Sequence, residues 1–140
     1  MTDEVKQHFA GKWSLEKSEN FEDFLKEVGV NFFLRKLAAR GTPVQTITVD
    51  EDKIGIATAT AFHTQSDAFK LGQEFEEERQ GMKMKVLPKW EDNKLIMEKF
   101  PIDSPVKPHK VFREKVGETM LMTIEIGNVI CKRWFKKLED

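Results

Sequence analysis

The feature of this sequence that most constrains its fold is a long succession of short segments with strand character. Within each segment, β-branched and aromatic residues alternate with polar ones, and Gly, Asn and Asp gather between the segments. Ten such segments can be counted along the chain. Many short strands spaced about 8–12 residues apart predict an antiparallel sandwich or barrel, in which neighbours in sequence pair with one another.

The predicted strands follow one another closely from residue 44 onward, after a single earlier strand. They cover residues 9–17, 44–49, 54–60, 63–71, 74–78, 82–90, 94–100, 110–116, 119–126 and 129–137. One of them contains Pro88, and because proline lacks a backbone donor we expect a gap typical of a sheet edge, or a bulge, at this position. If the strands close into a barrel, they should leave an internal hole, since a barrel of about eight strands can already hold one small ligand.

A helical pattern interrupts the strands only between residues 20 and 41. Apolar residues recur there with the spacing of one helix face, in two stripes separated by Gly29. The first stripe is Phe21, Phe24, Leu25 and Val28, and the second is Val30, Phe33, Leu34, Leu37 and Ala38. The pattern predicts two helices, at about residues 20–28 and 31–40. Helices this short are unstable alone in water, so we expect them to lie on the strands and cover the mouth of a barrel.

Composition limits the classes of function. The 140 residues form one predicted domain, residues 1–140, with 23 Lys and Arg against 24 Asp and Glu and a net charge of −1. This balance argues against a nucleic-acid partner, which usually requires a basic surface. A lone cysteine, Cys131, excludes an internal disulfide and fits a reducing compartment. Without a signal-like or membrane-spanning run, the sequence predicts a soluble cytoplasmic monomer.

Residue patterns for other chemistries are weak. The three histidines, His8, His63 and His109, are far apart in the sequence and match no metal-binding spacing. No Gly-rich phosphate loop is present, and the acidic run at 74–78 is expected to be a solvated strand edge rather than a calcium site. We therefore expect no metal, no cofactor and no enzymatic activity.

Four segments resemble the intracellular lipid-binding proteins, the family of the cytosolic fatty-acid-binding and cellular retinoid-binding proteins. These are residues 11–28 (GKWSLEKSENFEDFLKEV), 29–38 (GVNFFLRKLA), 69–77 (FKLGQEFEE) and 129–135 (VICKRWF). The resemblance implies an all-β calycin fold, a ten-stranded antiparallel up-and-down barrel (a clam) with a helix-turn-helix lid. It also implies a carrier that binds a small hydrophobic ligand without a covalent bond.

Two arginines match the head-group site of that family. In the family, two inward arginines receive the ligand carboxylate, often with a tyrosine; Arg113 and Arg133 match the arginines, and Phe135 stands at the tyrosine position. A guanidinium offers a fixed fork of donors that fits a carboxylate. Losing the tyrosine hydroxyl removes a hydrogen bond worth about 0.5–1.5 kcal/mol. Composition alone favours the opposite reading, in which each arginine faces solvent beside a Glu.

The resemblance also implies the residues around the cavity and its entrance. They are Phe21, Phe24, Leu25, Val30, Leu34, Ala38, Phe62, Met122, Ile124 and Cys131. Plain core packing is the alternative role for each of them. Phe32 lies off the apolar stripe beside Arg35 and Lys36, a combination that suits transient contact of the lid with an anionic membrane. Lys26, with these two cations, resembles a cluster that some members use to enter the nucleus.

The identity of the ligand stays open between three classes. The two arginines favour an acid, so a long-chain fatty acid comes first, retinoic acid second and retinol third. The ending at 131–137 is closer to the retinol-binding branch, whereas Lys89 and Trp90 are closer to the retinoic-acid branch. A small lipid-modifying enzyme and an interaction module with an empty barrel are the alternatives from other classes.

Overall fold

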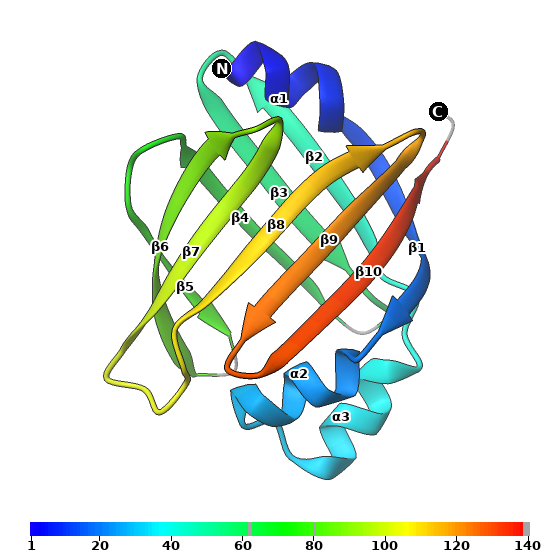
Figure 1. Cartoon of the computed structure of the whole chain (residues 1–140), viewed down its shortest axis with the longest axis vertical. Helices are drawn as coiled ribbons and strands as arrows, with labels where there is room; N and C mark the ends of the chain where they lie inside the picture. Colours follow the sequence, from blue (N-terminus) through cyan, green and yellow to red (C-terminus); the bar gives the residue numbers. More distant parts are fainter. Residues whose placement is uncertain (62, 80, 139–140) are drawn as a thin grey trace.

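In a computed structural model, which describes residues 1–61, 63–79 and 81–138, one antiparallel sheet curls into a nearly closed barrel (Figure 1). The helices are α1 (Thr2–Phe9), α2 (Phe21–Val28) and α3 (Phe32–Ala39). The strands are β1 (Gly11–Glu19), β2 (Val44–Asp50), β3 (Lys53–Ala59), β4 (Thr64–Lys70), β5 (Phe75–Arg79), β6 (Met82–Glu91), β7 (Lys94–Ile102), β8 (His109–Val116), β9 (Thr119–Ile126) and β10 (Val129–Lys137). The ten predicted strands are confirmed, and a barrel forms rather than a sandwich.

The strands pair in up-and-down order. Along the sheet the order is β4-β3-β2-β1-β10-β9-β8-β7-β6-β5, so only the β1–β10 pair joins strands distant in sequence. Strands β4 and β5 are the two edges. Pro88 belongs to β6 and pairs with Met97 of β7 on one side. On the other side the pairing of β6 with β5 extends only to Val86 and Phe75, so Pro88 lies beyond the end of that ladder. The position expected to be edge-like is confirmed.

The N-terminal segment differs from the prediction. Residues 2–9 form the helix α1, so Phe9 ends a helix instead of beginning a strand, and β1 begins at Gly11. The helix buries Val5 and Phe9, four residues apart, over the barrel end opposite the lid (Figure 1). Indole Nε1 of Trp13 donates to the carbonyl of Phe9 at 2.8 Å. A helix of this length depends on tertiary packing, which is why the local pattern did not predict it.

The two lid helices lie where the sequence predicts them. Helix α2 ends at Gly29, whose φ of 99° is the left-handed conformation that glycine adopts readily. Helix α3 begins after Asn31, whose side chain accepts a hydrogen bond from the amide of Leu34 at 3.0 Å. Among the described residues, no helix is both long and apolar enough to span a membrane.

The second apolar stripe is not buried as predicted. Phe33 is 72% exposed, Leu37 44% and Leu34 37%, whereas Val30, just before α3, is buried. Helix α2 packs on β9 and β10, but α3 packs mainly on α2 and lies outside it (Figure 1). The apolar face of α3 is exposed because the barrel rim does not extend beneath it.

Candidate functional site

A cavity of about 340 Å³ lies inside the barrel beneath α2, within the range of small-molecule sites. Its apolar wall comes from the lid, the inward faces of the strands and the β7–β8 connection: Phe21, Phe24, Leu25, Val28, Val30, Ile56, Phe69, Phe75, Met82, Met84, Met97, Val106, Val111, Met122 and Ile124. Its polar wall consists of Gln45, Thr58, Asp67, Glu77, Arg79, Lys99, His109 and Arg113. A long apolar chain with one polar end matches this lining.

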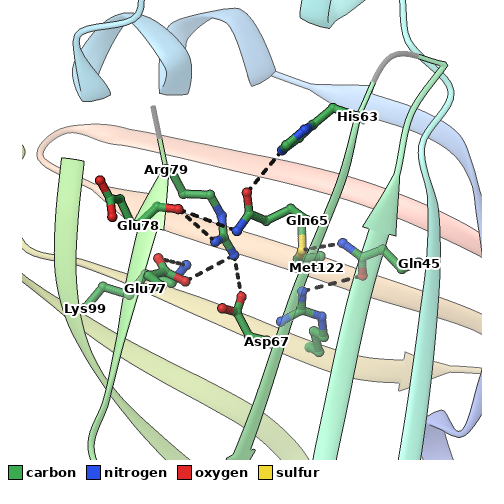
Figure 2. A network of polar contacts seen from close by, with 10 residues as sticks. Gln45, His63, Gln65, Asp67, Glu77, Glu78, Arg79, Lys99 and Met122 are labelled. Carbon is green, nitrogen blue, oxygen red and sulfur yellow. Dashed lines mark hydrogen bonds and ion pairs between the residues drawn. The ribbon is translucent and has the colours of Figure 1, made fainter. Parts of the chain in front are cut away.

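Four charged side chains form a connected group on one side of the cavity. Lys99 Nζ lies 2.7 Å from Glu77 Oε1, and Arg79 Nη2 lies 3.3 Å from Glu77 Oε2 and 2.6 Å from Asp67 Oδ2. Figure 2 shows Arg79 reaching from β5 to Asp67 on β4. These ion pairs therefore connect the two edge strands, and they balance the charges of the four side chains.

The burial of this group affects its acid–base behaviour. Burial by itself would raise the pKa of Glu77, but Lys99 and Arg79 hold that pKa below its ordinary value. Burial lowers the pKa of Lys99, and the attraction of Glu77 opposes this only in part. The sequence did not identify these residues. The acidic run at 74–78 does lie along an edge strand with Glu74, Glu76 and Glu78 exposed, but the prediction is wrong for Glu77, which is 7% exposed and paired inside the barrel. Its position two residues after the inward-facing Phe75 was the available signal.

Arg113 is a buried cation without a carboxylate partner among the described residues. It lines the cavity, its Nη2 is 3.5 Å from Gln45 Oε1, and its buried Nε has no hydrogen-bond partner there. Burial lowers its pKa to about 10. Since Asp67 and Glu77 are balanced by Arg79 and Lys99, Arg113 leaves the wall with one uncompensated positive charge. An anionic head group would neutralise it.

Arg133 has a different environment. The register places it in one row with Arg113, on either side of Met122, but its guanidinium is not part of the cavity wall. Its Nε donates to Ser18 Oγ at 2.9 Å, and its Cζ lies 3.6 Å from the ring centroid of Phe21 in α2. Burial lowers its pKa to about 10 as well. In this arrangement Arg133 holds the lid helix against β1 and β10.

The described members of the other predicted residues divide into three groups, and Phe62 is not among them. Phe21, Phe24, Leu25, Val30, Met122 and Ile124 line the cavity. Cys131 and Phe135 are buried in the core without lining it, and burial raises the pKa of the Cys131 thiol to about 11. Leu34 and Ala38 are exposed on α3, away from the lining, and Phe62 lies outside the described residues.

His109 links the cavity wall to the lid. Its buried ring lies edge-on to Phe24 of α2, with centroids 6.0 Å apart, and Nδ1 is 2.9 Å from the carbonyl of Lys107. Burial lowers the pKa of His109. Across the described residues, no three His, Cys, Asp or Glu side chains gather closely enough to hold a metal ion.

The fold and the cavity define a class of protein, a lidded barrel that encloses a small amphipathic ligand. The chain belongs to the lipocalin and cytosolic fatty-acid binding protein family, whose model matches residues 10–138. It is 38% identical to sodium/calcium exchanger regulatory protein 1 of Doryteuthis pealeii, over 93% of this chain and 96% of that protein. It is 36% identical to cellular retinoic acid-binding protein 1 of Takifugu rubripes, over 90% of this chain and 95% of that protein.

A solved structure extends the similarity to a ligand complex. The Schistosoma mansoni fatty acid binding protein in complex with arachidonic acid superposes with a TM-score of 0.86 at 33% identity, covering 94% of this chain and 97% of that one. The family model and this structural similarity therefore indicate the same family and the same barrel fold.

Proposed function

We propose that this protein is a carrier that binds a long-chain fatty acid, or a similar hydrophobic carboxylate, non-covalently inside the barrel. The observation that carries the proposal is Arg113, a buried guanidinium with an unpartnered Nε in a cavity with mostly apolar walls. A carboxylate would give Arg113 its missing acceptor and balance the one uncompensated charge. The Schistosoma mansoni relative was solved with a fatty acid, which supports the same class of ligand.

Burial of the ligand tail supplies most of the affinity in this proposal. Each methylene moved from water to the apolar wall contributes about 0.8 kcal/mol. The head group then determines orientation and selectivity, because an arginine–carboxylate pair is strongest away from bulk water. Arg133 is the second head-group residue in the proposal, and it would have to leave the ring of Phe21 to reach the cavity. Phe135 provides no hydroxyl, so Arg113 carries most of the selectivity.

A retinoid is the second candidate, supported by the relative named for retinoic acid. A competition titration on delipidated protein separates the candidates: a fatty acid against the alcohol of equal length, and retinoic acid against retinol. We expect each acid to bind at least about tenfold more tightly than its alcohol, about 1.4 kcal/mol. Arg113→Gln should remove that difference, and Arg40→Gln, at the exposed end of α3, should preserve it. Equal binding of acid and alcohol by the unaltered protein would refute the head-group assignment.

The exposed face of α3 supports a transient membrane contact in the proposal. Phe32 and Phe33 are 65% and 72% exposed, and the cations of Arg35 and Lys36 lie 5.6 and 5.4 Å from the Phe32 ring. Exposed aromatic rings beside cations favour an anionic lipid surface. We include in the proposal that the protein acts as a cytoplasmic monomer without a catalytic role. The proposal also includes nuclear entry through the cluster of Lys26, Arg35 and Lys36.

A further inference from the structure

We propose that the cavity also captures lipid aldehydes, as imines formed on the side chain of Lys99. This inference rests on the proposed carrier function, because the same apolar cavity must admit the aldehyde tail. Lys99 belongs to the cavity wall, and its side chain is 17% exposed. The other ion-paired lysines of the described structure have side chains between 37% and 63% exposed. An aldehyde inside the barrel therefore meets the amine of Lys99 rather than that of a surface lysine.

The position of Lys99 suits a ligand bound by its tail. It follows Leu95 and Met97 on the inward face of β7, and Met97 lines the same cavity. Lys99 pairs with His109 at the end of the β7–β8 ladder, close to the lining residue Val106 of the following connection. Lys99 therefore lines the cavity together with apolar wall residues, and in this inference the carbonyl at the polar end of a bound chain reaches its amine.

Glu77 is placed to assist the reaction. An amine must lose its proton before it attacks a carbonyl, and Glu77 Oε1 lies 2.7 Å from Nζ (Figure 2). Burial already lowers the pKa of the Lys99 ammonium, which makes the loss of this proton easier. Glu77 accepts the proton and can return it when the hydroxyl group leaves as water.

The overall step balances in atoms and charge. The nitrogen of Lys99 forms a bond to the aldehyde carbon, the carbonyl oxygen departs as water, and a protonated imine remains. One positive charge stands opposite Glu77 before and after the step, so the buried ion pair persists. The apolar wall limits the access of water, which slows hydrolysis back to the aldehyde. Arg113 cannot form this bond, so an acid and an aldehyde use different cations of one cavity.

The test is reductive trapping on the full, delipidated chain. The protein is incubated with hexadecanal, reduced with sodium cyanoborohydride, and mapped by peptide mass spectrometry. We expect the alkyl adduct on Lys99 at a rate about tenfold above that of any other lysine. Lys99→Arg keeps a cation opposite Glu77 and should abolish the cavity adduct while hexadecanol still binds. Lys110→Arg, at an exposed neighbour, is the matched control and should leave the Lys99 adduct unchanged.

A second variant tests the role of Glu77 in proton transfer rather than the position of the Lys99 amine. Glu77→Gln removes the proton acceptor but also the attraction that keeps Lys99 protonated, so the two proteins are compared over a range of pH. At the pH of fastest reaction for each protein, adduct formation should be slower in Glu77→Gln and should stay at Lys99. An adduct spread over exposed lysines, or unchanged in total amount in Lys99→Arg, would overturn the inference. Palmitate binding is measured on the same samples to separate the two proposals. Palmitate bound without an adduct refutes the aldehyde inference alone, whereas exclusion of both ligands refutes the carrier function as well.

Discussion

The inner wall of the barrel and the outer lid helix α3 both depart from the usual distribution, in which charged side chains are exposed and aromatic side chains are buried. Inside, Glu77 and Arg113 are each 7% exposed, although charged side chains are seldom fully buried. Outside, Phe32 and Phe33 are 65% and 72% exposed, although aromatic residues are usually covered. Each departure lowers stability unless a partner compensates for it. Among the described residues, the wall has internal partners for all its charges except Arg113. On α3, Phe32 has only the cations of Arg35 and Lys36 beside its ring, and Phe33 is 72% exposed.

The largest expected effect comes from breaking the ion pair on the inner wall. Lys99→Met leaves the buried Glu77 with only Arg79, and removing one partner of a buried pair is worth about 3–5 kcal/mol. We expect the free energy of unfolding, measured in urea, to fall by an amount near the lower end of this range. Replacing Glu77 by Leu as well should restore part of the loss, since both charges are then absent.

The matched control for that experiment is on the outer face of the barrel. Lys110→Met breaks a pair with Glu98 in which the lysine side chain is 52% exposed, so the loss should stay below about 1 kcal/mol. Equal losses in Lys99→Met and Lys110→Met would show that the inner wall has no special electrostatic role.

The pH dependence of stability tests the charges of the same wall. The folded-state pKa of Glu77 lies below its ordinary value of 4.5, because Lys99 and Arg79 outweigh the effect of burial. Its contribution to stability is therefore present above pH 4.5 and is lost as the pH falls through the lower folded-state pKa. The groups facing Glu77 are Lys99, Arg79 and His109. The melting temperature of Glu77→Gln should depend less on pH in this acidic window, and parallel curves for both proteins would contradict the assignment.

A smaller effect is expected where the lid meets the barrel. Phe21→Leu keeps an apolar side chain on α2 but removes the ring beneath which Arg133 lies, a contact worth about 0.5–2 kcal/mol. Hydrogen exchange of the α2 amides should become faster by the factor that corresponds to this loss of free energy. Phe24→Leu, whose ring contacts His109 instead, is the matched variant. Identical acceleration in both would assign the effect to general loosening of the lid.

The smallest effect on stability is expected on the exposed face. Phe33→Ser should change the free energy of unfolding by less than about 0.5 kcal/mol, because the side chain packs on little. It should nevertheless slow ligand transfer to vesicles that contain anionic lipid, as measured by a fluorescent fatty acid. Unchanged transfer would show that the exposed aromatic residues of α3 have no role in membrane contact.

Much of this molecule could be predicted from the chain alone. The ten strands, the two lid helices and the edge-like Pro88 follow from local periodicity and from the special backbone of proline and glycine. Arg113 was identified through a family resemblance, and the structure places it in the cavity wall. Helix α1 was missed because a short helix depends on what it packs against. The exposed stripe of α3 was misjudged because an apolar stripe does not show whether a surface lies beneath it.

The sequence by itself therefore determined which residues share a face of each strand, since alternation is a property of the extended backbone. Only the tertiary structure decided which inward residues meet. Glu77 and Lys99 come from strands β5 and β7, which are separated in the sheet by β6, and the curvature of the sheet (Figure 1) brings their side chains within 2.7 Å. Likewise, the docking of α2 set Phe21 over Arg133, while Arg113 in the cavity wall has no carboxylate partner among the described residues. Such encounters depend on sheet curvature and helix docking, and no local pattern encodes them.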